Sequence, residues 1–549
     1  MKITIAQLDP KVGDIDANLA LIRKARNIAA SSGTDLVVYS ELVVSGYPPE
    51  DLVQKTSFYN ACKKAVMDLA ADTKDGGPAM LVSAPWADNG KLYNGALLLD
   101  GGKLSAVIAK CKLPNYGVFD EVRLFDAGSC PVATQFRGHK IGIMTCEDMW
   151  DGEATKSLKQ SGAELLIVLN ASPFEMDKPN YRKKLAAQRA KESGLALIYV
   201  NQVGGQDELV FDGASFAISS NGKLKSRLPA FVSSVETISF STDGKIEPIE
   251  TTINIDMNKD EAIYSALVMG LRDYVNKNFF PGVLIGLSGG VDSALSAAIA
   301  VDALGAERVH CVMMPSPYTS DESLEDAAET ARLLGVRLDT ISIKPAMDAF
   351  DEMTAQQFTQ HPKDTTEENI QARARGVVLM AISNKFGYMV LSTGNKSEMS
   401  VGYATLYGDM CGGYSVLKDV YKTRVWELCR WRNSNHTDFF EGPNGLVMPE
   451  RVITKAPSAE LKPNQTDQDS LPPYEELDDI LHSLIELELP SSEIIKHGHS
   501  AETVARVWKM LDNAEYKRRQ APPGVKISSR AFGRDRRYPI TNGFRTDKF

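Results

Sequence analysis

The sequence lacks the features that mark several large classes of protein. No run of apolar residues approaches the ~18 that a membrane-spanning helix requires. Acidic residues outnumber basic ones by 71 to 61, and the net charge of −10 argues against general binding to nucleic acid or to anionic membranes. The 7 cysteines include no Cys-x-x-Cys pair, which favours a reducing cytoplasm over a disulfide framework. We therefore expect a cytoplasmic protein with no nucleic-acid or membrane partner.

What is present is the composition of a globular protein, with 43% hydrophobic and 24% charged residues. At 549 residues the chain is long enough for two or more domains, each with its own core. A polar stretch rich in Thr and Ser, at 221–258, separates two halves in which strand and helix patterns alternate. We predict one domain at residues 1–256 and another at 257–549, both of the α/β class.

The most informative stretch lies at the start of the C-terminal half. An apolar strand at 283–287 leads into Ser288-Gly289-Gly290, and an Ala-rich helix begins at Asp292. Backbone amides in such a turn, together with the positive end of a helix, form an anion site. Ser288 and Ser293 can donate hydrogen bonds, while Asp292 can hold a Mg²⁺ ion carried by phosphates. No Gly-Lys-Ser/Thr follows at the required spacing, so this is not a Walker loop.

Strand and helix patterns continue to alternate through this half. Helices are predicted at 264–276, 292–304, 323–334, 366–386 and 420–430, and further strands at 308–314, 338–343 and 388–392. Such alternation predicts a doubly wound parallel sheet that binds nucleotide at the carboxyl ends of its strands.

The N-terminal half also alternates, and it places three polar residues near strand ends. Strands are predicted at 3–8, 36–39, 79–83, 140–145, 165–170 and 196–201, with a helix at 15–30 and a hairpin turn at 100–103. Glu41, Lys112 and Cys146 are the three residues, and open α/β sheets usually place their sites at such ends. Singly, each has an ordinary interpretation as a solvated charge, a surface lysine or a packed cysteine.

Taken together, these residues resemble the triad of the nitrilase superfamily, in its glutamine-amidase branch, over nearly the first 250 residues. The resemblance implies an α-β-β-α sandwich with Cys146 as nucleophile, Glu41 as proton carrier and Lys112 as stabiliser of the oxyanion. It also implies that Glu121 braces the site. The glutamine substrate would be held by Tyr116, Ser172 and Lys178.

The C-terminal half resembles the NAD synthetase family, through the Ser-Gly-Gly-x-Asp-Ser loop and through Leu391–Glu398, Lys418–Thr423 and Lys455–Leu461. The resemblance implies a Rossmann-like ATP-pyrophosphatase fold. ATP would be bound by Gly286, Leu287, Ser288, Gly289, Gly290, Val291, Asp292, Ser293, Thr393, Lys422 and Ser458. Deamido-NAD would be bound by Asn369, Arg373, Glu398 and Lys517, and Mg²⁺ by Asp292 and Glu398. One departure concerns Leu406, because simpler family members have Lys there to contact the dinucleotide.

We therefore expect ATP-dependent amidation of deamido-NAD to NAD through an adenylated intermediate, with ammonia taken from glutamine. The products would be AMP, pyrophosphate and glutamate. One alternative is another ATP-splitting amidotransferase, although GMP-forming relatives carry a Cys-His-Glu amidase instead. The other is a nitrilase-type amidase with a nucleotide-binding regulatory domain, against which Asp292, Glu398 and Lys517 speak because all three are retained.

The expected partners are small molecules. Glutamine, ATP and deamido-NAD are the substrates, and Mg²⁺ is the cofactor. Family resemblance also implies a homo-oligomer, either a dimer or a larger assembly up to an octamer.

Overall fold

The computed structural model describes residues 1–241, 245–463 and 465–544. The chain divides into two compact units, Met1–Met257 and Asn258–Phe549. The division lies one residue after the boundary expected from the polar stretch. Each unit is described by itself below.

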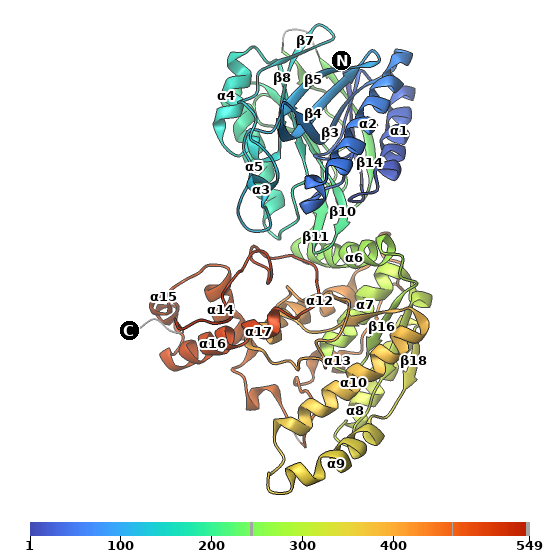
Figure 1. Ribbon diagram of the computed structural model, residues 1–549, viewed down its shortest axis with the longest axis vertical. Helices are drawn as coiled ribbons and strands as arrows, with labels where there is room; N and C mark the ends of the chain where they lie inside the picture. Colours follow the sequence, from blue (N-terminus) through green and yellow to red (C-terminus); the bar gives the residue numbers. More distant parts are fainter. Residues whose placement is uncertain (242–244, 464, 545–549) are drawn as a thin grey trace. The chain divides into compact units, whose positions relative to one another are not determined.

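The first unit contains two stacked β-sheets (Figure 1). The order in the seven-stranded sheet is β15 (Glu247–Pro248), β14 (Ser234–Ser241), β1 (Lys2–Gln7), β2 (Leu36–Val38), β3 (Ala79–Asp88), β4 (Lys91–Asp100) and β5 (Lys103–Ala109). The order in the six-stranded sheet is β13 (Leu224–Arg227), β12 (Phe216–Ile218), β9 (Ala196–Asn201), β8 (Leu165–Asn170), β7 (His139–Thr145) and β6 (Thr134–Phe136). A separate hairpin joins β10 (Val203–Gln206) to β11 (Leu209–Asp212).

Helices cover the outer faces of both sheets. Apolar residues of α1 (Ile15–Ser31) and α2 (Thr56–Asp72) pack on the first sheet, and those of α4 (Gly152–Gln160) and α5 (Lys178–Ser193) pack on the second. Between the sheets, alternate strand residues such as Ile5, Leu81 and Ile167 form an apolar core. Each such side chain contributes about 1.5–3 kcal/mol on burial. The predicted α-β-β-α sandwich is confirmed.

The second unit is built on a five-stranded parallel sheet. Its order is β18 (Arg337–Thr340), β17 (Val309–Met313), β16 (Val283–Gly286), β19 (Met389–Ser392) and β20 (Tyr414–Ser415). The order steps outward in both directions from β16, so the predicted doubly wound arrangement is confirmed. The strand order reverses direction at β16, and such folds hold their ligands at this switch point, beside the carboxyl ends of the strands.

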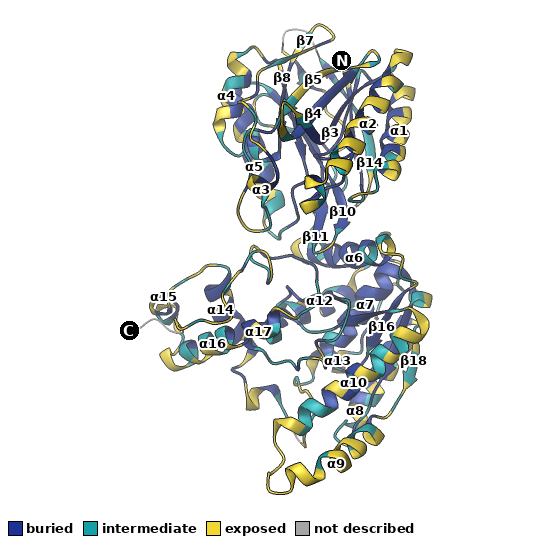
Figure 2. Ribbon diagram, viewed as in Figure 1, coloured by how far each residue is buried: buried dark blue, intermediate teal, exposed yellow. Residues whose placement is uncertain are grey.

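Helices surround this sheet as the alternation predicted. α7 (Val291–Leu304) contacts α6 (Lys259–Lys277), α8 (Asp321–Leu334) and α12 (Lys422–Ser434). α7 also packs on β16 and β17, whereas α10 (Thr365–Phe386) packs on β16 and β19, through a cluster that includes Leu284 and Val390. Figure 2 shows the contrast between buried α7 and the largely exposed α9 (Lys344–Phe358), a helix absent from the sequence prediction.

A helical cluster at the C-terminal end was also not predicted. It contains α14 (Tyr474–Ile485), α15 (Ser491–Lys496), α16 (Ala501–Asn513) and α17 (Glu515–Arg518), which pack with α11 (Lys396–Val401) (Figure 1). Among all described helices, none is long and apolar enough to cross a membrane.

Candidate active sites

In the first unit, Cys146 lies at the turn that follows β7. It opens the short helix η3 (Cys146–Met149), and its backbone is left-handed, with φ of 43°. A side chain in this region is strained, and such strain is commonly retained at functional positions. A capping box between Thr145 and Asp148 holds the turn. Cys146 is 5% exposed, so the thiol lies just below the surface.

Glu41 is a fully buried carboxylate with three donors around it. Its Oε1 accepts from Asn94 Nδ2 and from Lys110 Nζ, each at 2.8 Å, and its Oε2 accepts from the backbone N–H of Ala171 at 3.1 Å. A buried carboxylate needs such partners because burial alone would penalise its charge. The side chain is therefore held in one orientation before any substrate binds.

The lysine of this cluster is Lys110, and the prediction of Lys112 is wrong. Lys110 is 1% exposed and places Nζ 2.8 Å from Glu41 Oε1 and 2.8 Å from Glu121 Oε2. Lys112 lies at the surface, where Nζ pairs with Asp151 at 2.9 Å and with Glu153 at 2.6 Å.

The physical reason is the end of β5 at Ala109. Beyond it, the backbone N–H groups of Cys111 and Lys112 both donate to Asp148, at 3.0 and 2.8 Å. This bend turns the Lys112 side chain outward, whereas Lys110 stays inside.

Opposing charges set the electrostatics of the cluster. Burial opposes the charge of Lys110, but Glu121 and Glu41 outweigh it and raise the pKa of Lys110 well above its usual value. Burial and Glu41 raise the pKa of the Cys146 thiol, and Lys110 only partly opposes them. Glu121, which also accepts from Tyr47 Oη at 2.9 Å, has a pKa raised mainly by burial. Burial and the charge of Glu41 thus favour the neutral form of the Cys146 thiol.

The residues predicted to hold glutamine divide into two groups. The Tyr116 hydroxyl donates to Glu147 Oε2 at 3.0 Å, and Lys178 Nζ lies 5.6 Å from the ring centroid of Phe119, which stacks edge-on with Tyr116. Tyr116 is exposed and Glu147 directly follows Cys146, so these side chains lie on the surface side of the cysteine turn. Ser172 is instead buried, and its hydroxyl accepts from Arg182 Nε at 3.1 Å.

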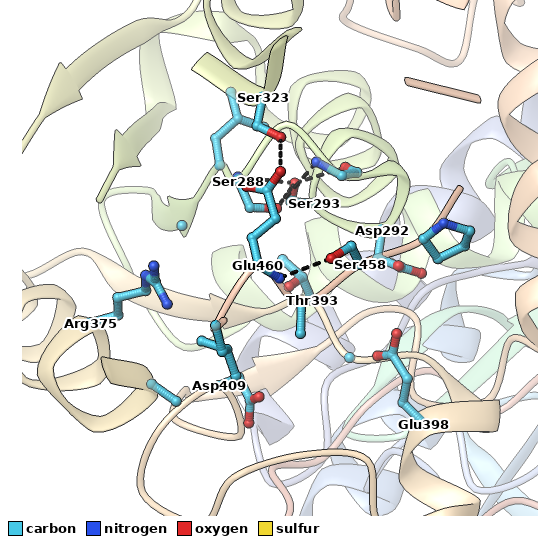
Figure 3. A pocket seen from close by; sticks show the side chains of 18 of the residues that line it. Ser288, Asp292, Ser293, Ser323, Arg375, Thr393, Glu398, Asp409, Ser458 and Glu460 are labelled. Carbon is cyan, nitrogen blue, oxygen red and sulfur yellow. Dashed lines mark hydrogen bonds between the residues drawn. The ribbon is translucent and has the colours of Figure 1, made fainter. Parts of the chain in front are cut away.

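In the second unit, a cavity of about 540 Å³ lies at the carboxyl ends of β16, β17 and β19 (Figure 3). It is lined by most of the predicted ATP-binding residues, namely Gly286, Leu287, Ser288, Gly290, Val291, Asp292, Ser293, Thr393, Lys422 and Ser458. Gly289 is not part of this lining. Its φ is +80°, and a Cβ there would lie 2.3 Å from the carbonyl oxygen of Ser323, so only glycine fits.

The loop before α7 is ordered by its own serines. Ser293 Oγ accepts from the backbone N–H of Ser288 at 3.2 Å and lies 3.1 Å from Ser288 Oγ (Figure 3). Ser288 Oγ also accepts from the N–H of Gly290 at 3.2 Å. The N-terminus of α7 thus faces the cavity with two hydroxyls beside it, an arrangement suited to an anion.

Two carboxylates and a lysine form the charged corner of this cavity. Lys422, which is buried, forms an ion pair with Asp292 and lies 3.5 Å from Glu398 Oε1. Asn395 Nδ2 donates to Asp292 Oδ1 at 2.8 Å. Burial and the neighbouring Asp292 raise the pKa of Glu398 to about 8. The corner therefore holds two carboxylates whose repulsion a single lysine offsets only in part.

Three residues predicted to bind the dinucleotide do not line this cavity. Asn369 Oδ1 accepts from Thr405 Oγ1 at 2.9 Å, and Arg373 Nε donates to the carbonyl oxygen of Leu406 at 3.2 Å. Lys517 Nζ donates to the carbonyl oxygens of Gly402 and Ala404, at 2.8 and 2.6 Å. All three contact the segment 402–406, which follows α11.

Several lining residues were missed by the sequence reasoning. Arg375 lies on α10, where its Nε donates to the Met314 carbonyl at 3.1 Å and its guanidinium points into the cavity (Figure 3). Asp409 also lines the cavity, and burial raises its pKa to about 6. Glu460 accepts from the hydroxyls of Ser320 and Ser323, at 2.7 and 2.8 Å. On α10, Ala372, Gly376 and Leu379 line the cavity together with Arg375, at the three- and four-residue spacing of one helix face.

Comparison with known families defines the class of protein. The family model described as carbon-nitrogen hydrolase matches residues 2–242, and the one described as NAD synthase matches residues 263–521. The chain thus joins a carbon-nitrogen hydrolase domain to an NAD synthase domain.

Full-length relatives narrow the class. Glutamine-dependent NAD(+) synthetases of Rhodobacter capsulatus and Acinetobacter baylyi are each 46% identical to the chain, covering 99% and 100% of it and 99% of each relative. The solved structure of the Acinetobacter baumannii synthetase in complex with ADP matches 100% of this chain and 99% of its own, with a TM-score of 0.79 and 44% identity. The chain belongs to the glutamine-dependent NAD(+) synthetases. It is therefore an enzyme that forms NAD with glutamine as its nitrogen source.

Proposed function

We propose that the two sites divide the reaction between them. Glutamine is hydrolysed at Cys146 in the first unit, and deamido-NAD is activated with ATP and amidated at the cavity in the second. What supports this division most directly is the buried Glu41–Lys110–Glu121 cluster beside a strained cysteine, in a chain that also carries the Ser288–Ser293 phosphate-type loop.

At the amidase site, the sulfur of Cys146 attacks the side-chain carbonyl carbon of glutamine while Glu41 takes the thiol proton. The ammonium of Lys110 stabilises the negative charge that develops on the carbonyl oxygen. Glu41 then returns the proton to the departing nitrogen, which leaves as ammonia. A water molecule, deprotonated by Glu41, cleaves the resulting thioester and releases glutamate. Tyr116 and Lys178 orient the glutamine substrate. Ser172 is buried, so it would affect glutamine binding indirectly, by positioning the loop in which it lies.

At the synthetase cavity, a carboxylate oxygen of deamido-NAD attacks the α-phosphorus of ATP, and pyrophosphate leaves. Ammonia then attacks the activated carbonyl carbon and displaces AMP. The N–H groups and hydroxyls of the Ser288–Ser293 loop bind phosphate oxygens, and Lys422 lies within reach of the same charges. Thr393 and Ser458 contribute polar contacts on the cavity wall. Gly286, Leu287 and Val291 supply its backbone surface.

The donor set fits Mg²⁺ as the cofactor. Asp292 and Glu398 present hard oxygen donors beside the phosphate loop, and Mg²⁺ is commonly held by one or two carboxylates together with substrate phosphates. Among the described residues no cluster of three or more His, Cys, Asp or Glu is placed to hold a metal ion. Bound beside Asp292 and Glu398, Mg²⁺ would supply charge neutralisation on the phosphates.

The remaining expectations are also proposals. Asn369, Arg373 and Lys517 bind deamido-NAD through the 402–406 segment that all three contact, and Leu406 itself offers an apolar surface where simpler relatives have Lys. A homo-oligomer follows from the resemblance of the synthetase half. A reducing cytoplasm is supported by the 7 cysteines, all of which are free thiols.

Product analysis tests the proposed function. Incubation with glutamine, ATP, Mg²⁺ and deamido-NAD should yield NAD, AMP, pyrophosphate and glutamate, with AMP and pyrophosphate in equal amounts. Formation of ADP and inorganic phosphate in place of AMP and pyrophosphate would contradict the adenylation step. ATP that binds without ever being cleaved would favour a regulatory role for the second unit.

A further inference from the structure

Asp148 is a buried carboxylate to which the mechanism above assigns no role. It is 1% exposed and stands two residues after Cys146, within η3. Burial raises the pKa of its carboxyl, while the backbone N–H donors around it act in the opposite direction. Burying a carboxylate this deeply costs free energy unless hydrogen bonds compensate for the lost water. The contacts of Asp148 therefore show what the burial is used for.

Those contacts reach the two segments that carry the reacting groups. Asp148 Oδ2 accepts from the backbone N–H of Thr145, the residue immediately before Cys146, at 3.1 Å. Asp148 Oδ1 accepts from the backbone N–H groups of Cys111 and Lys112, the two residues immediately after Lys110, at 3.0 and 2.8 Å. The carboxylate therefore joins the nucleophile turn to the lysine segment through main-chain N–H groups on both sides, with the Cys111 thiol as an additional donor.

The segment that follows Lys110 is not fixed by regular secondary structure. In the described chain, residues 110–120 belong to no helix or strand, so the N–H groups of Cys111 and Lys112 have no partner in a helix or ladder and pair with Asp148 instead. Lys110 itself is anchored on one side, by its N–H to the Asn94 carbonyl at 2.9 Å and by its carbonyl to the Gly128 N–H at 2.8 Å. Asp148 supplies the anchor on the other side.

The nucleophile turn needs a similar support. Cys146 is held at φ of 43°, a conformation that costs roughly 1–2 kcal/mol for a residue with a Cβ. The capping box between Thr145 and Asp148 offsets that cost locally. One side chain thus stabilises the strained turn and ties it to the neighbouring segment.

We propose that Asp148 is a positioning residue of the amidase site, which fixes the separation between the Cys146 sulfur and the Lys110 ammonium by binding both backbone segments at once. This inference rests on the proposed function, because it takes Cys146 as the nucleophile and Lys110 as the oxyanion stabiliser. Misplacement of a reacting group by about 1 Å costs on the order of 100-fold in rate.

The bonding pattern requires a carboxylate in particular. Three backbone N–H groups face the two oxygens, so an amide in their place would set its NH₂ group against at least one donor. Asp148→Asn keeps the shape and removes this match. Asp148→Glu keeps the charge and displaces it by one methylene. Cys111→Ala is the matched control, because it removes only the thiol contact to Asp148 Oδ1, at 3.2 Å, and leaves the backbone N–H in place.

The test uses the full-length enzyme and compares glutamine kcat, glutamine KM and the pH dependence of Cys146 alkylation by iodoacetamide. For Asp148→Asn we expect kcat to fall about 100-fold or more while KM changes less than about threefold, because the proposed glutamine-binding groups stay in place. The alkylation midpoint should move to higher pH, because Lys110 then lies farther from the thiolate. Cys111→Ala should keep kcat within about threefold of wild type. NAD formation from ammonium should be unchanged in both variants.

A folded Asp148→Asn enzyme whose kcat stays within about threefold of wild type would overturn the inference. If Asp148→Asn shows no cooperative unfolding of the first unit, the variant has not folded, and the same measurements are made on Asp148→Glu. A normal transition with kcat reduced about tenfold or more supports positioning, and a wild-type kcat overturns it. Failure of the proposed function is seen separately, as wild-type glutaminase activity that survives Cys146→Ala.

Discussion

The two sites of this enzyme manage charge in opposite ways. At the amidase site, Glu41, Lys110 and Glu121 are buried together and satisfy one another before any substrate arrives. At the synthetase cavity, Asp292 and Glu398 share Lys422 beside open space of about 540 Å³. A neutral amide brings no charge, so the protein supplies the whole set internally. In the proposed function a nucleotide brings several negative charges to the second cavity, so the charges of that site would be completed only by the ligand and its cation.

The sharpest way to break this comparison is to remove the lysine from the closed cluster. Lys110→Met should lower glutamine hydrolysis about 1,000-fold or more, because the oxyanion loses its cation. It also leaves Glu41 and Glu121 buried without their partner, which should cost about 3–5 kcal/mol of stability. Glutaminase assays and thermal unfolding measure both effects. Lys112→Met is the matched control and should stay within about twofold of wild type, because surface ion pairs contribute little.

Substitution in the charged corner of the synthetase cavity should affect the other half of the reaction. Asp292→Asn should reduce pyrophosphate release by about 100-fold or more, because phosphate charge loses a carboxylate-held cation, yet basal glutamine hydrolysis should persist. Pyrophosphate release with ammonium as the nitrogen source is the measurement. Near-normal release in this variant would remove Asp292 from the proposed metal role.

The pH dependence of Cys146 alkylation tests the arrangement of charges around Glu41, Lys110 and Glu121. Because burial and Glu41 hold the pKa of the thiol well above its usual value, alkylation of free enzyme should have its midpoint above the ~8.5 of an ordinary thiol. Glu41→Gln removes a negative charge and should lower that midpoint, whereas Lys110→Met removes a positive charge and should raise it. Rates of iodoacetamide incorporation between about pH 6 and 10 give the midpoints. Shifts in the same direction for both variants would contradict the arrangement of charges.

The smallest expected effects are on substrate KM values, and they should differ between Arg373 and Arg375 of α10. Arg375→Ala should raise the ATP KM about tenfold, because a guanidinium that lines the cavity is lost. Arg373→Ala should instead raise the deamido-NAD KM, because this residue contacts the 402–406 segment. Steady-state assays with ammonium measure both constants. Equal effects on the ATP KM would mean that the cavity lining does not distinguish the two residues.

Local patterns in the sequence predicted much of this architecture. Apolar runs such as 165–170 and 196–201 match the observed strands, because a buried strand needs continuous apolar residues whatever surrounds it. The Ser288–Ser293 loop was recognised because its chemistry is contained in a few consecutive residues. The doubly wound order followed from strict alternation of strands and helices.

What could not be predicted depended on contacts between distant segments. Whether Lys110 or Lys112 points into the cluster depends on where β5 ends and on the backbone N–H groups that Asp148 binds. Sequence spacing shows neither of these features. Arg375 was placed on a helix, but which side of α10 faces the cavity depends on how that helix packs on β16. The helices α14–α17 bury their apolar residues against α11 and one another. No alternation of strands and helices in this part of the sequence indicated where they lie.

The most direct test of the central claim compares wild type with Cys146→Ala in NAD formation from deamido-NAD, ATP and Mg²⁺, with glutamine or ammonium as the nitrogen source. The account predicts that the variant loses the glutamine-driven reaction and keeps the ammonium-driven one near its wild-type rate. Glutamine-driven NAD formation that persists without the Cys146 thiol would contradict the division of labour between the two sites.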